Sequence, residues 1–250
     1  MTSSIYPSLA GKTVVVTGGG SGIGAEIVRG FARQHAKVFF LDIAEKDSRA
    51  LAAELGGAAE FVKCNLLNLD ELRDALAAVE ERAGSVHTLV NNAANDDRHS
   101  FEKVTPAYWE ERINVNLRHY FFAAQAVTAG MRRGGGGAII NLGSVSWHLG
   151  LPDLVLYEVA KAGIEGLTRA LARDLGEANI RVTSVIPGAI RTPRQMALWH
   201  TPEEEKKIVT QQCLKARVEP SDVSAMVQFL ASDDARFCTG HAYWVDAGYR

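Results

Sequence analysis

Thr17-Gly18-Gly19-Gly20-Ser21-Gly22-Ile23-Gly24 decides the fold of this 250-residue chain. The segment follows a short apolar run, Lys12–Thr17, of the kind that forms a strand buried on both faces of a parallel sheet. It then opens an amphipathic stretch, Gly22–Gln34. Glycines at such a turn let backbone N–H groups approach a pyrophosphate at the positive end of a helix. The spacing is Gly-x-x-x-Gly-x-Gly, not the commoner Gly-x-Gly-x-x-Gly, but the strand–turn–helix context favours dinucleotide binding over an ordinary turn.

The same alternation of strand-like and helix-like segments continues along the chain. The candidate strands are Lys12–Thr17, Lys37–Asp42, Glu60–Cys64, His87–Asn91, Ala138–Leu142, Arg181–Ile186 and Ala242–Val245. The candidate helices are Gly22–Gln34, Lys46–Leu55, Leu69–Arg82, Pro106–Met131, Val155–Leu175 and Ser221–Ala231. This rhythm predicts an α/β fold, a Rossmann-like doubly wound parallel sheet of about seven strands with helices on both faces.

Domain organisation follows from the absence of a linker, an internal repeat or a low-complexity segment in the sequence. We expect residues 1–250 to form a single nucleotide-binding domain. The least regular interval, at about 189–217, contains prolines, Trp199 and the charged run Glu203–Lys207. It would lie beyond the carboxyl end of a strand, where ligands bind in open α/β sheets, and it is a candidate substrate lid. An ordinary surface insertion is the alternative.

Composition excludes several classes of function. A net charge of −2 gives no reason to expect a nucleic-acid partner. The three cysteines are scattered and odd in number, which favours a reducing compartment, and neither they nor the dispersed histidines have metal-ligand spacing. The N-terminus has no signal-peptide core, and no apolar run reaches membrane-spanning length. We expect a cytoplasmic protein without a metal site and without a membrane partner.

Asp42 points to the identity of the dinucleotide. It ends the second candidate strand, 18 residues beyond Gly24. A carboxylate there can accept hydrogen bonds from the adenosine ribose of NAD and would repel the 2′-phosphate of NADP. No Lys or Arg occupies the glycine-rich turn to attract that phosphate. The sequence therefore predicts a preference for NAD, with a strand-end cap as the alternative role of Asp42.

Tyr157 and Lys161 are the strongest candidates for catalysis. They stand four residues apart in a predicted helix, so the phenol and the ammonium share one face. A free tyrosine has a pKa of about 10 and is a poor base at neutral pH. An ammonium about 5 Å away, at an effective dielectric of about 20, favours the phenolate by roughly 3 kcal/mol, or about two pKa units. We therefore expect Lys161 to lower the pKa of Tyr157, although the spacing alone also arises by chance.

With these features the chain resembles the short-chain dehydrogenase/reductase family over nearly its whole length. Gly18, Gly22 and Gly24 match the family's dinucleotide turn. Asn91-Asn92-Ala93-Ala94 is similar to the family's Asn-Asn-Ala-Gly segment, and Asn114-Val115-Asn116-Leu117 and Ser144 match two catalytic positions. Pro187-Gly188 and Thr192 resemble the segment that holds the nicotinamide carboxamide. Three departures are Asn65 for an aspartate at the adenine, Ala94 for the glycine, and Ala160 for a serine.

The resemblance implies a role for each matched residue. Tyr157 would be the general base, Lys161 would also bind the nicotinamide ribose, Ser144 would hold the reacting oxygen, and Asn116 would hold a proton-relay water. The expected catalytic residues are Asn116, Ser144, Tyr157 and Lys161. The expected cofactor-binding residues are Gly18, Ser21, Gly22, Ile23, Gly24, Asp42, Asn65, Leu66, Asn91, Ala93, Tyr157, Lys161, Pro187, Gly188, Ile190 and Thr192. The family also implies a homotetramer. Small residues on the predicted helix would permit close packing between subunits, namely Ala160, Ala162, Gly163, Gly166 and Ala170. Packing within the chain explains some of these small residues equally well.

Blocks outside the shared motifs narrow the resemblance to bacterial NAD-dependent sugar 1-dehydrogenases. They include Asn95-Asp96-Asp97-Arg98-His99, Glu111–His119, Ser146–Leu151 and Cys238-Thr239-Gly240-His241. This implies oxidation of an aldopentose at its anomeric carbon to the aldonolactone, with D-xylose favoured and L-arabinose as an alternative. The tentative sugar contacts, beside Asp96 and Arg98, are Asn95, Ser146, Trp147, His148, Glu158, Arg194, Gln195 and Trp199. Their alternative roles are loop capping, surface charge or core packing.

Two rival functions remain open from the sequence. The same four catalytic residues would serve a ketone or 3-oxoacyl reductase, although the polar loops that carry Trp and His suit a sugar better than an acyl chain. A non-catalytic NAD-binding regulator would keep the glycine turn and tolerate loss of Tyr157 or Lys161, and both are present.

Overall fold

The computed structural model describes residues 4–249, and a parallel sheet of seven strands forms the centre of this range. The strand order is β3-β2-β1-β4-β5-β6-β7, so the chain reverses its direction of growth between β1 and β4. The strands are β1 (Thr13–Thr17), β2 (Lys37–Asp42), β3 (Ala59–Lys63), β4 (Thr88–Asn91), β5 (Gly137–Leu142), β6 (Ile180–Pro187) and β7 (Ala242–Val245). The predicted doubly wound fold is confirmed, and each candidate strand ends within one residue of its predicted limit.

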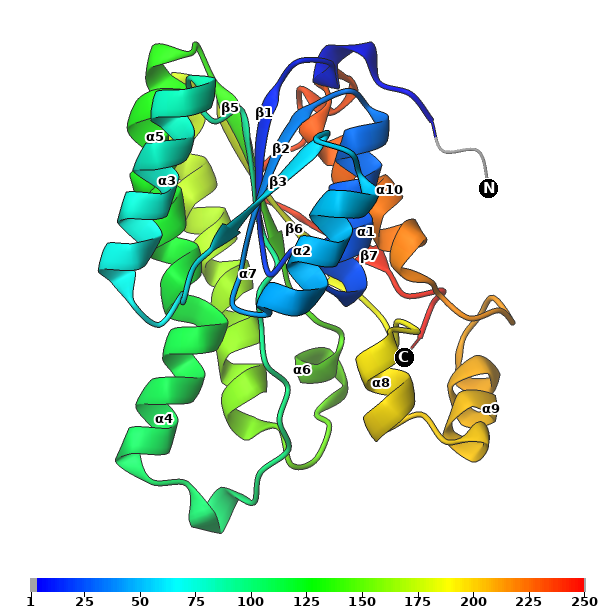
Figure 1. The fold of residues 1–250 in the computed structure, drawn as a ribbon. Helices are drawn as coiled ribbons and strands as arrows, with labels where there is room; N and C mark the ends of the chain where they lie inside the picture. Colours follow the sequence, from blue (N-terminus) through cyan, green and yellow to red (C-terminus); the bar gives the residue numbers. More distant parts are fainter. Residues whose placement is uncertain (1–3, 250) are drawn as a thin grey trace.

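Helices cover both faces of the sheet (Figure 1). One face carries α1 (Gly22–Arg33), α2 (Glu45–Glu54) and α10 (Pro220–Ala231). The other carries α3 (Leu69–Ala83), α5 (His119–Arg133) and α7 (Val155–Leu175). Helices α4 (Pro106–Ile113), α6 (Ser146–Leu149), α8 (Pro193–Leu198) and α9 (Pro202–Gln211) lie beyond one end of the sheet, at the bottom of the figure. No helix within the described residues has the length and hydropathy needed to cross a membrane.

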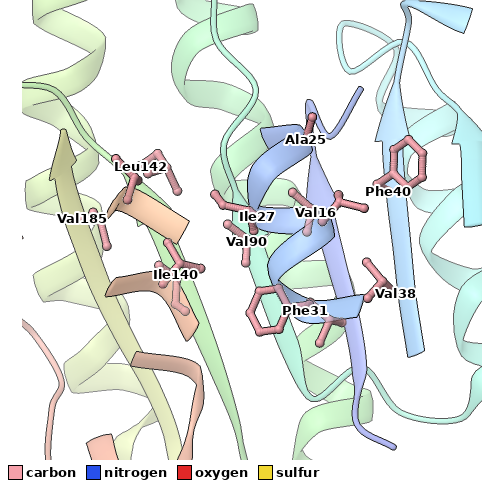
Figure 2. Close-up of a cluster of buried hydrophobic side chains, with 14 of the residues drawn as sticks. Val16, Ala25, Ile27, Phe31, Val38, Phe40, Val90, Ile140, Leu142 and Val185 are labelled. Atoms are coloured by element: carbon pink, nitrogen blue, oxygen red, sulfur yellow. The ribbon is translucent and has the colours of Figure 1, made fainter. Parts of the chain in front are cut away.

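The core consists of one apolar cluster on each face of the sheet. Val16 and Phe31, from β1 and α1, belong to the first cluster, and Figure 2 shows them near Val38 and Val90 of the neighbouring strands β2 and β4. The second cluster lies beneath α3 and α5 and includes Val15 and Leu72. Every residue of β1 is buried, as expected for a central strand with helices above and below it. This rigid centre fixes the carboxyl ends of the strands, where the candidate site residues lie.

The prediction of one continuous helix over Pro106–Met131 is wrong in the middle of this stretch. The helix widens into a π-helical turn at Asn114–Arg118, between α4 and α5. The Asn116 side chain donates to the Arg112 carbonyl oxygen at 3.0 Å and also bonds the backbone of Asn95 outside the helix. A side chain that joins the helical ladder in this way is a known cause of such a turn. Apolar periodicity alone does not reveal it.

The interval 189–217 contains two short helices, α8 and α9. Each begins with a proline after a threonine whose hydroxyl accepts a backbone N–H of the first turn, namely Thr192 for α8 and Thr201 for α9. Both helices lie beside the C-terminus of the chain (Figure 1). This interval therefore follows the carboxyl end of β6. It lies near the place where the strand order reverses between β1 and β4, which is where we expect a substrate lid.

Candidate active site

A cleft of about 1030 Å³ lies outside the carboxyl ends of the strands. Such a volume is at the upper end for small-molecule and cofactor sites. Of the expected cofactor residues, the structure brings all but Asn91 to the cleft wall: Gly18, Ser21, Gly22, Ile23, Gly24, Asp42, Asn65, Leu66, Ala93, Tyr157, Lys161, Pro187, Gly188, Ile190 and Thr192. The catalytic candidate Ser144 lines the same cleft.

The glycine-rich turn is closely packed, and it depends on the lack of side chains. A Cβ on Gly24 would lie 1.9 Å from the Gly18 carbonyl oxygen and 2.6 Å from the Asn92 amide nitrogen. Gly18 itself has a φ of +65°, in the left-handed region that favours glycine. The Asn92 amide donates to the carbonyl oxygens of Thr17 at 3.1 Å and of Gly18 at 2.8 Å. The turn is thus held in one shape at the start of α1, as a phosphate-binding turn requires.

Asp42 is held by the backbone on both sides. One carboxylate oxygen accepts the Gly20 N–H at 2.8 Å, and the other accepts the Ala44 N–H at 2.8 Å. A Cβ on Gly20 would meet Ser48 and Asp42 at 2.3 and 3.0 Å. The carboxylate therefore has a fixed place in the cleft, and its remaining lone pairs suit the two hydroxyls of a ribose.

Tyr157 and Lys161 project from the first turns of α7 into the cleft. The Lys161 Nζ lies 5.4 Å from the centre of the Tyr157 ring. Lys161 is almost fully buried and donates to the Leu142 carbonyl oxygen at 2.7 Å. The Ser144 hydroxyl is within 2.9 Å of the Ser146 hydroxyl, and a hydrogen bond from Ser144 lowers the pKa of Tyr157. Hydroxyl, phenol and ammonium thus meet in one place.

The expected lowering of the Tyr157 pKa by Lys161 is wrong for this structure. Burial raises the pKa of the phenol, the Asp96 carboxylate raises it further, and the Ser144 hydrogen bond offsets only part of the effect. Burial also lowers the pKa of Lys161 to about 7, while Asp96 acts in the opposite direction. Near neutral pH the lysine therefore carries only part of its charge.

Asn116 does not line the cleft. It is fully buried, and its side-chain oxygen accepts the Asn95 N–H at 2.8 Å. Its amide donates to the carbonyl oxygens of Asn95 and Arg112, at 3.1 and 3.0 Å. Asn116 thereby joins the π-turn to the loop after β4, which carries candidate sugar contacts.

That loop is tied to the candidate lid. Asp96 accepts from Arg194 at 3.2 Å and from Gln195 at 2.6 Å, and both donors belong to α8. The Arg98 guanidinium lies 5.1 Å from the centre of the Trp199 ring at the end of the same helix. All five residues line the cleft. A charged bridge therefore joins the loop after β4 to the candidate lid at the cleft.

Besides Asn116, four of the expected site residues do not line the cleft. Asn91 is buried and donates to the Asn141 side-chain oxygen at 2.9 Å. Glu158 accepts the Leu151 N–H at 2.8 Å. Trp147 and His148 turn away from the cleft and share one carboxylate oxygen of Glu165, at 2.9 and 2.8 Å. The remaining expected sugar contacts do line the cleft, namely Asn95, Ser146, Arg194, Gln195 and Trp199.

Sequence reasoning missed an apolar wall and the contribution of α9. Leu149, Leu151 and Leu154 line the cleft just before α7. Their position between Ser144 and Tyr157 was the available signal. From the lid, the missed residues are His200, Glu204, Lys207, Ile208 and Gln211, with Tyr249 near the C-terminus. The charged run in this interval gives no sign of which side chains face inward.

The donor set of the cleft fits a dinucleotide better than a metal ion. Glycine backbone at a helix start, a fixed carboxylate and a buried lysine match the phosphates and ribose hydroxyls of NAD or NADP. Within residues 4–249 no group of three or more His, Cys, Asp or Glu side chains is placed to hold a metal ion.

Comparisons with known proteins agree with this geometry. A family model described as enoyl-(acyl carrier protein) reductase matches residues 18–250. The chain is 62% identical to D-xylose 1-dehydrogenase of Caulobacter vibrioides, with 100% of both chains covered. It is 46% identical to a probable galactose dehydrogenase of Rhizobium meliloti, covering 99% of this chain and 98% of that protein. A short-chain type dehydrogenase/reductase from Mycobacterium ulcerans superposes with a TM-score of 0.91 at 29% identity, over 97% of this chain and 90% of that one. The chain therefore belongs to the short-chain dehydrogenase/reductase family.

Proposed function

We propose that this protein is an NAD-dependent sugar 1-dehydrogenase that oxidises an aldopentose, D-xylose first, at the anomeric carbon to the aldonolactone. The observation that carries this proposal is the 62% identity to D-xylose 1-dehydrogenase over the full length of both chains. The cleft supports it, because Ser144, Tyr157 and Lys161 meet beside a dinucleotide-type turn. The 46% identity to a probable galactose dehydrogenase supports the broader class of sugar substrates.

The reaction breaks the C1–H bond and the O–H bond of the anomeric hydroxyl, and C1 becomes the lactone carbonyl. Bound NAD supplies the acceptor for the hydride. Tyr157 takes the hydroxyl proton as general base, and Ser144 holds the reacting oxygen through its hydroxyl. Lys161 binds a ribose hydroxyl, and only in its protonated form does it favour the phenolate against the effect of burial. The phenol and the ammonium titrate as a coupled pair, because each changes the charge that the other faces.

The part of the cleft between the loop after β4 and α8 suits a polyhydroxylated substrate. Asp96, Arg194 and Gln195 form a hydrogen-bonded bridge there, so donors and acceptors stand at fixed places. Trp199 adds a flat apolar surface, and its buried indole N–H has no acceptor within the described part of the chain. We propose that this bridge and Trp199 contact the sugar hydroxyls and that 189–217 acts as the lid. A long acyl chain would leave the charged bridge without suitable partners.

We propose NAD rather than NADP as the coenzyme. The Asp42 carboxylate is held by the N–H groups of Gly20 and Ala44, so it cannot swing aside for a 2′-phosphate without losing both bonds. The neighbouring Ile43 is exposed and uncharged, and it offers no cation to that phosphate. Repulsion by a fixed carboxylate therefore disfavours NADP.

We also propose that the enzyme is cytoplasmic and assembles as a homotetramer. Cys64, Cys213 and Cys238 are free thiols, which fits a reducing compartment. Gly166 lies on the exposed side of α7 with no atom within 4 Å of a Cβ built there, which leaves room for a neighbouring subunit. A monomeric mass by light scattering would contradict the assembly.

The proposal is tested by following NADH absorbance with D-xylose, L-arabinose, D-galactose, D-glucose and a 3-oxoacyl substrate. We expect kcat/KM to be highest for D-xylose with NAD. Tyr157→Phe should reduce kcat by orders of magnitude and leave NADH binding intact. Turnover of the 3-oxoacyl compound with no turnover of any sugar would overturn the proposal, and so would near-wild-type activity of Tyr157→Phe.

A further inference from the structure

A second tyrosine, Tyr120 of α5, lies directly behind the catalytic lysine. Its side chain is fully buried and does not line the cleft. Its hydroxyl donates to the Leu142 carbonyl oxygen at 3.1 Å. The same hydroxyl accepts from the Lys161 Nζ at 3.2 Å. Because one proton serves the carbonyl, a lone pair of the phenol oxygen is available for the ammonium.

Lys161 is thus held at two points on the wall of the site. Its Nζ donates to the Tyr120 hydroxyl and, at 2.7 Å, to the Leu142 carbonyl oxygen. The Nζ also lies 5.4 Å from the centre of the Tyr120 ring, a distance at which an aromatic face attracts a cation. An ammonium has three donors, so two are engaged behind the cleft and one is left for a ligand within it.

Few other groups around this ammonium provide charge. His119 packs on Tyr120 with ring centres 4.5 Å apart, and burial, reinforced by Lys161, lowers its pKa to about 3, so it is neutral at physiological pH. Tyr157 presents a phenol from the same helix as Lys161. Asp96, on the loop after β4, is the carboxylate whose charge acts on both Tyr157 and Lys161. The two oxygen acceptors behind the lysine are therefore its direct support.

We propose that the Tyr120 hydroxyl is a positioning residue that keeps Lys161 charged and directs its third donor at the nicotinamide ribose. The inference rests on the proposed dehydrogenase function, but it concerns a residue outside the four expected catalytic ones. Burial favours the neutral amine. Each hydrogen bond to an oxygen acceptor favours the ammonium, and such charge-assisted bonds are among the stronger ones in proteins.

The test is Tyr120→Phe, which keeps the ring and removes only the oxygen. Tyr6→Phe is the matched control, because it loses the same hydroxyl far from the cleft, where the Tyr6 ring packs at 6.5 Å from Phe229. Leu142 keeps its bond from Lys161 in the variant, so the melting temperature should stay within a few degrees of the wild type. A hydrogen bond to a charged group is worth about tenfold or more in an equilibrium.

Two readouts separate positioning from packing. The first is NADH affinity, measured by fluorescence across pH, which should fall as Lys161 loses its proton. In Tyr120→Phe the midpoint of that fall should move about one pH unit lower, and in Tyr6→Phe it should not move. The second is kcat for the sugar, which should fall about tenfold in Tyr120→Phe.

An unmoved NADH-binding midpoint in Tyr120→Phe would overturn the inference, even if kcat fell, because a purely structural role would leave that midpoint in place. The binding readout needs no sugar turnover. If the wild-type enzyme failed to oxidise sugars but Tyr120→Phe still showed the shifted midpoint, the proposed function would be refuted and this inference would stand.

Discussion

Gly24→Ala tests whether the glycine-rich turn must keep its present shape to bind the dinucleotide. The new Cβ would stand 1.9 Å from the Gly18 carbonyl oxygen and 2.6 Å from the Asn92 amide nitrogen, whereas real Cβ atoms essentially never come within 3.0 Å of such atoms. The start of α1 must therefore retreat from Gly18 by at least 1.1 Å, the difference between 3.0 and 1.9 Å. Asn92 cannot yield easily, because it already bonds the Gly18 carbonyl oxygen at 2.8 Å.

This displacement of the start of α1 should affect both the stability of the fold and the binding of the dinucleotide. Overpacking of this kind costs about 1–3 kcal/mol of folding free energy. A displacement of about 1 Å in a binding constellation costs about a hundredfold in function. We therefore expect the Kd for NADH to rise about tenfold to a hundredfold in Gly24→Ala, and the free energy of unfolding to fall by about 1–3 kcal/mol.

The assay is a fluorescence titration with NADH, paired with urea unfolding. Gly176→Ala is the control, since Gly176 has helical backbone angles, φ −60° and ψ −39°, and no atom within 4 Å of a Cβ. It should bind NADH as the wild type does. If Gly24→Ala bound NADH with wild-type affinity, the turn would not be the pyrophosphate site, and the assignment of this end of the cleft would be wrong.

Three further predictions concern coenzyme choice, the loop after β4 and pH. Asp42→Ala should raise kcat/KM for NADP relative to NAD by about a hundredfold. Two like charges about 5 Å apart at an effective dielectric of about 20 repel each other by about 3 kcal/mol. An unchanged ratio would show that Asp42 serves only as a strand-end cap. Asn116→Ala should lower the free energy of unfolding by about 2–4 kcal/mol, because Asn95 and Arg112 lose hydrogen-bond partners, and a loss below about 0.5 kcal/mol in urea unfolding would argue against that role. Burial lowers the pKa of His119 to about 3, so its imidazole stays neutral in the folded protein. The free energy of unfolding should therefore fall as the pH decreases from about 6.5 towards 3, by about 2–3 kcal/mol at pH 4.5. Urea unfolding of His119→Phe should show a clearly weaker dependence on pH.

The fold was predictable because its signals are local. Short apolar runs such as Val14–Val16 and Phe39–Leu41 can be buried on both faces only in a covered parallel sheet. The turn at Gly18–Gly24 then locates the cofactor end, since its spacing is tied to the first strand and helix. Most expected cofactor residues line the cleft for the same reason: they follow strand ends, and strand ends of a parallel sheet share one edge.

The sugar end was harder because its side chains are directed by tertiary contacts. Trp147 and His148 look like sugar contacts in the sequence, but the short helix α6 turns them toward Glu165. The pKa of Tyr157 also depends on burial, which the spacing to Lys161 does not reveal. The place of Tyr120 behind the lysine depends on the π-turn that precedes α5, which rotates the helix relative to its apolar pattern.

Oxidation of D-xylose carrying deuterium at C1 tests the central claim most directly. If the cleft transfers hydride from the anomeric carbon, the reduced coenzyme recovered from NAD will carry that deuterium, and xylonolactone or its hydrolysis product will have lost it. Reduced coenzyme without the label, or no reduced coenzyme from D-xylose at all, would contradict the proposed reaction.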